Sequence, residues 1–178
     1  MAHIVFLRGA NVGGNNVFRP AQLARALADL DVVNVGAAGT FVVRADASAD
    51  AIRRAILAQL PFATELAIRP LREIHRLVER APFGGVAFSK DLRGWVATLA
   101  APTRARPKLP IVAPESGRWQ VRFDRVEGAY AFGLWQRPVK GGIVMPNQVV
   151  ERALGVPATV RFWETFERIA KVPLSTRK

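Results

Sequence analysis

Apolar residues along the first third of the chain recur either at every second position, which predicts strands, or at every third or fourth position, which predicts helices. Pro20 suits the first turn of a helix, and Ser48 suits the residue that caps one. Gly36-Ala37-Ala38-Gly39 is a turn signal between two apolar runs. The predicted elements are a strand at 3–8, a helix at 20–30, strands at 32–35 and 40–45, a helix at 48–60 and a strand at 65–69. This order, β-α-β-β-α-β, is that of a ferredoxin-like unit.

The second half repeats much of that order, with a loop in place of its first helix. Residues 102–110 contain three prolines and three basic residues, which excludes a regular helix there. The other predicted elements are a bridging helix at 70–80, strands at 95–100, 119–125 and 130–135, a helix at 146–154, a strand at 157–162 and a helix at 163–171. We therefore predict an α+β fold of two ferredoxin-like (βαββαβ) halves packed as one compact unit with mostly antiparallel sheets. The predicted halves are 1–81, with the bridging helix, and 82–178, with a degenerate first helix.

Composition and charge narrow the class of protein. The chain has 178 residues, half of them hydrophobic, and no cysteine, which suits a reducing cytoplasm. Its apolar runs are too short for a membrane span or for the core of a signal peptide, so we expect a cytoplasmic protein without a membrane partner. The net charge is +12, and residues 70–178 alone carry +10. Such a half attracts nucleic acid, acidic protein or anionic lipid without specifying which.

A Gly/Asn-rich loop between the first strand and the first helix, residues 9–16, is the segment that looks built for more than packing. A strand that leads through such a loop into a helix can hold an anion on backbone N–H groups. Gly9 and Gly14 have the spacing of a P-loop, but Asn15 and Asn16 stand where lysine and serine or threonine are required, which excludes ATPase and kinase chemistry. The same residues suit a structural turn in which Gly and Asn adopt positive φ and Asn side chains bind loop backbone. The turn is the more economical interpretation, and the anion site stays open beside it.

The predicted hairpin at 119–135 partly follows the aromatic pattern of an RNA-recognition strand. Tyr130 and Phe132 would be the stacking residues. The mixture of basic and aromatic residues found in single-strand platforms is supplied by Trp119, Arg122, Arg125 and Arg137. Alternation of Tyr130, Phe132 and Leu134 on one face nevertheless favours a strand covered by helices.

Other kinds of site have weak support. Arg104, Arg106 and Lys108, together with Lys140 beside a Gly-Gly pair, could grip phosphates, although such residues are more often solvated surface. With two histidines and no cysteine, the sequence predicts no metal site, and it offers no catalytic triad, acid–base pair or cofactor motif.

Both ends of the chain resemble a known family. Arg8-Gly9-Ala10-Asn11-Val12-Gly13-Gly14-Asn15-Asn16 resembles the opening signature of the bacterial family called domain of unknown function 1697. Residues 149–155 and 158–165 resemble its closing helix and its Arg-Asn-Trp-Asn-Thr signature, with Phe162 and Glu164 in place of the two asparagines. The resemblance implies an α+β protein with ferredoxin-like halves, cytosolic and without an agreed substrate.

These observations favour a non-enzymatic binding protein of the bacterial cytosol whose partner is anionic or phosphate-bearing, with nucleic acid the most economical partner. The candidate anion-binding residues are Arg8, Asn11, Gly13, Gly14, Asn15, Asn16, Lys140 and Arg161. Tyr130 and Phe132 are weaker candidates for base stacking. One alternative is a small-molecule enzyme that uses the Gly9–Asn16 loop as an anion site, which requires a deep pocket with a perturbed ionisable group. Another is a scaffold that dimerises through strand edges, and the oligomeric state stays open.

Overall fold

The computed structural model describes residues 1–11, 13–14, 16–139 and 141–174. The chain divides into two compact units, each described by itself. Unit 1 consists of Met1–Pro82 and the segment from Glu164 onward, and unit 2 consists of Phe83–Trp163. The predicted halves placed everything after residue 81 in the second half, so the two divisions differ in the C-terminal segment.

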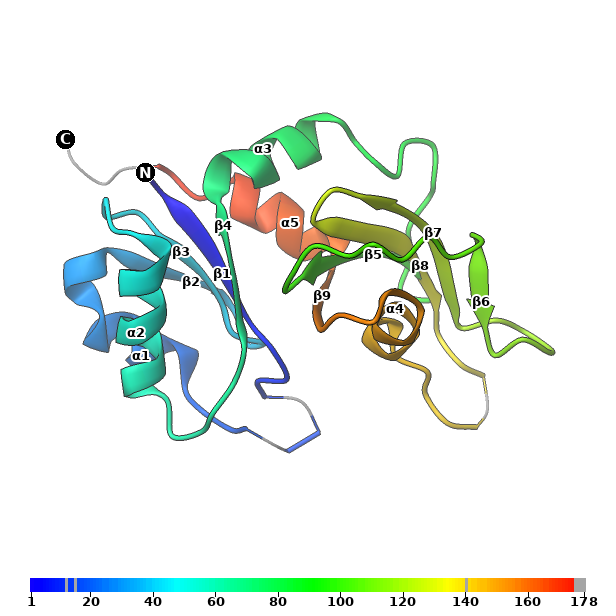
Figure 1. Cartoon of the computed structure of the whole chain (residues 1–178), viewed down its shortest axis with the longest axis horizontal. Coiled ribbons are helices and arrows are strands. Elements are labelled where there is room, and N and C mark those ends of the chain that lie inside the picture. Colours follow the sequence, from blue (N-terminus) through cyan, green and yellow to red (C-terminus); the bar gives the residue numbers. More distant parts are fainter. Residues whose placement is uncertain (12, 15, 140, 175–178) are drawn as a thin grey trace. The chain divides into compact units, whose positions relative to one another are not determined.

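Unit 1 contains a four-stranded antiparallel sheet in the order β2-β3-β1-β4 (Figure 1). Its elements are β1 (His3–Leu7), α1 (Pro20–Ala26), β2 (Val32–Gly36), β3 (Thr40–Val43), α2 (Ala49–Gln59), β4 (Leu66–Pro70), α3 (Leu71–Glu79) and α5 (Trp163–Ala170). The predicted elements of this part are present, although the predicted helix at 20–30 finishes as a separate 3-10 turn, Ala28–Leu30. Ser48 caps α2 as predicted, because its hydroxyl accepts a hydrogen bond from the Ala51 N–H at 3.2 Å.

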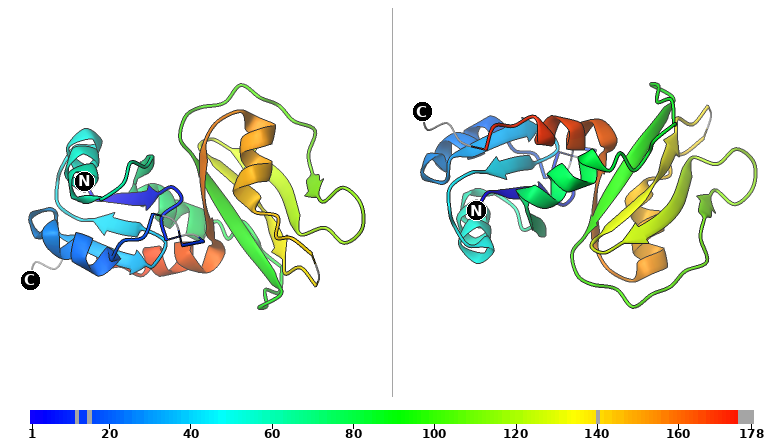
Figure 2. Two further views of the ribbon diagram at one scale, coloured as in Figure 1. Left: turned by 90° about the horizontal axis from the view of Figure 1, so that it is seen from below. Right: turned by 90° about the horizontal axis from the view of Figure 1, so that it is seen from above.

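Two helices cover one face of the unit 1 sheet. Leu23 and Leu27 of α1 join Ile52 and Ile56 of α2 in one core with the inward residues of β1 and β3. On the opposite face Phe6 packs against Phe166 of α5, with ring centroids 5.6 Å apart. The helices α3 and α5 lie side by side in Figures 1 and 2. The sheet is thus enclosed by helices on both faces.

Unit 2 contains a five-stranded antiparallel sheet in the order β6-β7-β8-β5-β9. Its elements are β5 (Leu92–Leu99), β6 (Ile111–Ala113), β7 (Val121–Glu127), β8 (Tyr130–Gln136), α4 (Pro146–Leu154) and β9 (Ala158–Phe162). The stretch 102–110 forms no helix or strand, as its prolines predict. The sequence did not predict β6, because three residues between two prolines are too few to show alternation.

One helix, α4, packs on the unit 2 sheet through Val150 and Leu154 (Figure 2). Fully buried Trp95 anchors this core and donates its indole N–H to the Leu134 carbonyl at 3.0 Å. Gly133 makes room for Trp95, because a Cβ at this position would lie 2.4 Å from a carbon of the indole ring. The protein therefore has a mixed α+β fold with two antiparallel sheets.

No helix in the described part of the chain is long and apolar enough to cross a membrane.

Candidate functional site

The Gly/Asn loop of unit 1 is held together by its own polar side chains. The Asn11 side-chain amide donates to the carbonyls of Phe18 at 3.2 Å and Ala37 at 2.7 Å, and its oxygen accepts from the Phe18 N–H at 3.0 Å. Asn16 donates its side-chain amide to the Gly9 carbonyl at 3.2 Å. These four bonds occupy the side-chain amides of Asn11 and Asn16 with backbone groups of Gly9, Phe18 and Ala37, as a structural turn requires.

The backbone of the loop adopts the conformation that this turn requires. Positive φ angles occur at Gly9, Asn11, Gly13, Gly14 and Asn16, the residue types that tolerate them best. Gly13 and Gly14 are exposed. The candidate Asn15 lies outside the described residues.

Arg8 lies at the start of this loop beside an acidic side chain. Its Nε lies 3.6 Å from a carboxylate oxygen of Glu65, and its carbonyl accepts a hydrogen bond from the Thr64 hydroxyl at 2.7 Å. A carboxylate this close competes with any anion for the guanidinium.

Arg161 belongs to unit 2, where it is paired with Val96 across β9 and β5. Its Nη1 donates to the Val160 carbonyl at 2.8 Å. Burial lowers the pKa of its guanidinium to about 10, so the side chain still carries its charge at neutral pH. The other cation proposed with it, Lys140, lies outside the described residues.

The two candidate stacking residues are buried. Phe132 has no exposed surface and Tyr130 is 7% exposed. Phe132 packs against Phe83, with ring centroids 6.3 Å apart, and the Arg125 guanidinium lies 4.6 Å from its centroid. The buried strand that the alternation favoured is confirmed, and a base cannot stack on Phe132 in this arrangement.

The tryptophan of the same hairpin, Trp119, lies instead in a surface hollow of about 260 Å³. The lining residues are Pro114, Ser116, Arg118, Trp119, Gln120, Arg137, Pro138 and Val139. Arg118 and Arg137 are exposed there, and the Arg122 guanidinium lies 5.8 Å from the Trp119 ring centroid. We call this set, Arg118, Trp119, Arg122 and Arg137, the Trp119 surface.

Each arginine of the Trp119 surface is oriented through its Nε atom. Arg118 Nε donates to the Gln136 side chain at 2.8 Å, and Arg122 Nε donates to the Asp124 carboxylate at 2.6 Å. Arg137 Nε lies 3.3 Å from an Asp91 carboxylate oxygen. Within the described part of the chain, the terminal nitrogens of these three guanidinium groups make no hydrogen bond. The three forks keep open terminal nitrogens, the donors that suit phosphate oxygens. Asp124 and Asp91 compete for Arg122 and Arg137 as Glu65 does for Arg8, whereas Arg118 is held by a neutral amide.

Gln120 fixes the loop that forms one wall of this hollow. Its side chain donates to the Gly142 carbonyl at 3.0 Å and accepts from the Val144 N–H at 2.8 Å. Its backbone N–H donates to the Ala113 carbonyl, and its own carbonyl accepts from the backbone N–H of Gln136. Nothing in the sequence singles out this glutamine, because its role depends on strands that meet only in the folded unit.

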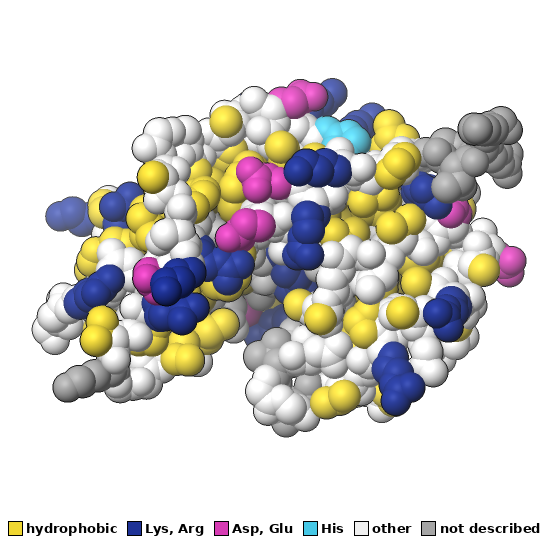
Figure 3. Space-filling view, turned by 180° about the vertical axis from the view of Figure 1, so that it is seen from behind, with side chains coloured by type: hydrophobic (Ala, Val, Ile, Leu, Met, Phe, Trp, Pro, Cys, Tyr) yellow, Lys and Arg dark blue, Asp and Glu magenta, His cyan; other side chains and the backbone are white. Residues whose placement is uncertain are grey.

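Positive charge is spread over the surface. Figure 3 shows Lys and Arg side chains in separate groups on one face, several of them beside Asp or Glu side chains. Net charge alone therefore marks no site on this face, and the Trp119 surface is distinguished by the local geometry of its arginines.

Comparisons with known proteins identify a family and a fold. The family whose sequence profile matches residues 1–125 is described as protein of unknown function (DUF1697). A solved structure of a conserved bacterial protein from Streptococcus pneumoniae is similar to this chain with a TM-score of 0.59, and the match covers 96% of this chain and 97% of that one. The two sequences are 15% identical, so this likeness concerns the fold alone. No curated protein matches the sequence.

Proposed function

Because the chain belongs to the DUF1697 family, whose description names no activity, we propose a function from the geometry: a non-enzymatic binding protein whose partner bears phosphates. Single-stranded nucleic acid is the partner that fits best. The observation that carries the proposal is the Trp119 surface: the indole lines a hollow with Arg118 and Arg137, Arg122 lies 5.8 Å from its ring centroid, and all three arginines keep open terminal nitrogens.

The chemistry of the Trp119 surface suits a single strand better than a duplex. An indole offers a face on which any base can stack, and each such contact is worth about 1–3 kcal/mol. Guanidinium forks bind the phosphates on either side of that base. Residues 83–163 hold twelve basic and five acidic side chains, so the field of this unit attracts a polyanion.

The enzyme alternative has less support. It requires a perturbed ionisable group in a pocket at the Gly9–Asn16 loop. Among the described residues, the groups whose pKa clearly departs from its usual value are His3, Asp46 and Arg161, and these three residues lie outside that loop. The residues Arg8, Asn11, Gly13, Gly14, Asn15 and Asn16 stay a second, weaker anion-site proposal.

The test is fluorescence anisotropy of a short labelled oligouridine over a salt series. Three phosphate contacts predict a slope of log K against log salt of about −2 for a single strand. Trp119→Leu should weaken binding about tenfold with the slope unchanged, because it removes stacking and no charge. Arg118→Gln should make the slope shallower by about 0.7.

The matched control is Arg54→Gln, which removes one exposed arginine of α2 in unit 1. It should leave both affinity and slope at their original values. If Arg54→Gln and Arg118→Gln lost equal affinity, binding would depend on net charge and not on the Trp119 surface. Unchanged affinity of Trp119→Leu would show that the indole does not stack on a base.

We further propose that both units are variants of the ferredoxin-like plan. In unit 1 the strand order β2-β3-β1-β4 supports it: counted along the chain, the second, third, first and fourth strands lie side by side. In unit 2, with β6 set aside, the order β7-β8-β5-β9 follows the same rule. The extra strand β6 then extends the sheet beyond β7. The domain division at residue 81 and the cytoplasmic location stay predictions.

A further inference from the structure

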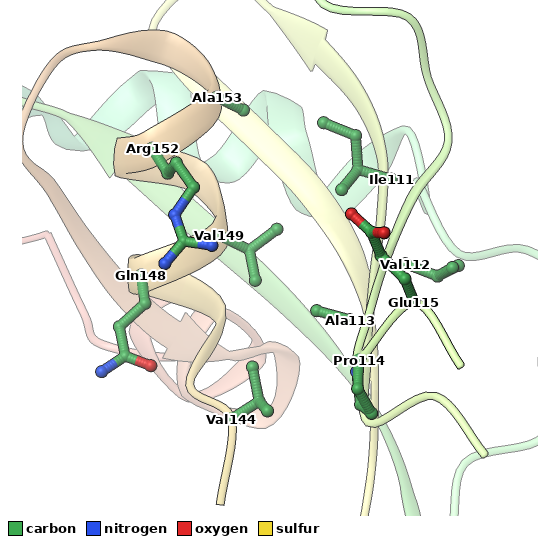
Figure 4. Close-up of a pocket in the computed structure, with 10 residues that line it drawn as sticks. All are labelled: Ile111, Val112, Ala113, Pro114, Glu115, Val144, Gln148, Val149, Arg152 and Ala153. Atoms are coloured by element: carbon green, nitrogen blue, oxygen red, sulfur yellow. The ribbon is translucent and has the colours of Figure 1, made fainter. Parts of the chain in front are cut away.

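A cavity of about 530 Å³ lies in unit 2 between β6 and α4. Its walls are apolar: Ile111 and Ala113 of β6, Val144, and Val149 and Ala153 of α4 (Figure 4). Each of these five side chains is half-buried, so each keeps apolar surface in contact with water. A cavity of this size and lining is typical of a small-molecule site.

The cavity follows from how the sheet of unit 2 is covered. In unit 1, helix α1 connects β1 to β2, and α1 and α2 together cover one face of the sheet. In unit 2 the corresponding crossover, from β5 to β7, runs through the helix-free stretch 100–110 and β6. The loop residues Ala105 and Leu109 pack on the core, but α4 is the helix that covers this face. The uncovered strip beside α4 is where the cavity lies.

Three polar side chains stand at the mouth of the cavity. Arg152 and Gln148 project from α4, and Glu115 projects from the segment that follows β6. Figure 4 shows the guanidinium of Arg152 and the carboxylate of Glu115 reaching from opposite walls into the space between them. Both side chains are exposed, and neither side chain forms a hydrogen bond or ion pair within the described part of the chain.

We propose that this cavity binds a small zwitterion with a large apolar side chain, that is, an amino acid or an amino-acid-like molecule. The apolar side chain lies against Val149 and Ile111. The carboxylate of the ligand pairs with the Arg152 guanidinium, which matches it as a two-pronged fork. The ammonium of the ligand pairs with Glu115. A ligand with only one of these charges would leave one of the two side chains without a partner, so the pair selects for a zwitterion.

This site is independent of the nucleic-acid proposal. The cavity and the hollow of the Trp119 surface border each other at Pro114, but the remaining lining residues differ. Failure of one binding test therefore leaves the other unaffected.

The test is a titration of the full chain against fluorinated probes, read as ¹⁹F line broadening. The zwitterionic probe is 4-fluoro-L-phenylalanine. One analogue, 4-fluorophenethylamine, lacks the carboxylate, and the other, N-acetyl-4-fluoro-L-phenylalanine, lacks the ammonium. Because each analogue lacks one of the two charged groups that the site would pair, the zwitterion should bind about tenfold more tightly than either analogue.

Two variants assign the two charges. Arg152→Gln should weaken binding of the zwitterion about tenfold and leave 4-fluorophenethylamine unchanged, because that probe has no carboxylate. Glu115→Gln should weaken the zwitterion and leave the N-acetyl probe unchanged. Val149→Trp, which fills the cavity, should abolish binding of all three probes.

Two exposed residues of unit 1 provide matched controls, Arg54→Gln and Glu79→Gln. Neither should change the affinity for any probe. The proposal is overturned if the zwitterion does not bind, if the three probes bind equally, or if Val149→Trp binds as the unmodified chain does. A circular dichroism melt of each variant confirms that lost binding is not lost folding.

Discussion

The two units cover a face of their antiparallel sheets in different ways. On one face of its antiparallel sheet, unit 1 buries apolar side chains under two helices, α1 and α2. Unit 2 uses α4 and an irregular segment, which leaves a cavity beside the helix. The difference extends to polar groups: the side chains of Asn11 and Asn16 are occupied by backbone groups of unit 1, whereas the arginines of the Trp119 surface keep open donors. A segment whose composition looks functional can thus be structural, while the open chemistry lies elsewhere.

The largest expected difference between the units concerns the helix that covers each sheet. Ile56 of α2 is fully buried, so Ile56→Ala should lower the free energy of unfolding by about 2–5 kcal/mol. Val149 of α4 already borders a cavity, so Val149→Ala should cost no more than about 1 kcal/mol. Urea denaturation of both variants measures the two costs. Equal costs would mean that the cavity wall is as well packed as the core of unit 1.

The Gly/Asn loop offers the next test. Asn11→Ala removes three side-chain hydrogen bonds and places alanine at a φ of 53°, so it should cost about 2–3 kcal/mol. Asn16→Gly keeps the positive φ and loses one hydrogen bond, which should cost about 0.5–1.5 kcal/mol. Chemical denaturation again gives both values. A negligible effect of Asn11→Ala on stability would remove the structural role and return the loop to the list of binding sites.

A larger side chain should destabilise the helix–sheet core of unit 1 and leave that of unit 2 unchanged. Ile52 is fully buried in unit 1, so Ile52→Phe overpacks the core and should cost about 1–3 kcal/mol. In unit 2 the larger side chain of Val149→Phe can enter the cavity, so the free energy of unfolding should stay within about 0.5 kcal/mol of its original value. Thermal melts of the two variants compare their stabilities. A large loss of stability in Val149→Phe would show that the cavity cannot accept an aromatic ring.

The smallest expected effect is a pH dependence that belongs to unit 1. Burial, followed by the N-terminal ammonium, lowers the pKa of His3 below its usual 6.5. The unfolded chain therefore binds the proton more readily than the folded one, and stability falls as the pH drops through 6.5 and levels off below the folded pKa. His3→Gln should flatten this part of the stability curve. An unchanged curve in the variant would assign the dependence to other groups.

The elements with strong periodicity were predictable from the sequence. The strand at 3–8, the capped helix at 48–60 and the helix at 146–154 agree with β1, α2 and α4 to within about two residues. Strand β6 was not, because its three residues are paired by β7 rather than by any local pattern. The predicted end of the helix at 30 was too late, since Leu27 leaves the α-helical conformation and a 3-10 turn follows.

Less of the candidate sites could be predicted. The residue types of the Gly/Asn loop indicated a turn, but only the folded unit shows that the Asn11 side chain binds Ala37 in the turn between β2 and β3. Trp119, Arg122 and Arg137 were visible as a basic and aromatic mixture, whereas the part played by Arg118 and Gln120 depends on contacts between β7, β8 and the loop before α4. The cavity had one signal in the sequence: the proline-rich stretch at 102–110 where a helix would otherwise lie.

The central claim is that the open binding chemistry lies in unit 2 and not in the Gly/Asn loop. The most direct test is a ¹⁵N-resolved NMR titration of the full chain with oligouridine. We predict that the largest shifts fall on the Trp119 indole N–H and on the backbone amides of Arg118 and Gln120, with the amides of Gly9, Asn11 and Gly13 unmoved. Shifts concentrated on those loop amides, with the Trp119 indole unmoved, would contradict the account.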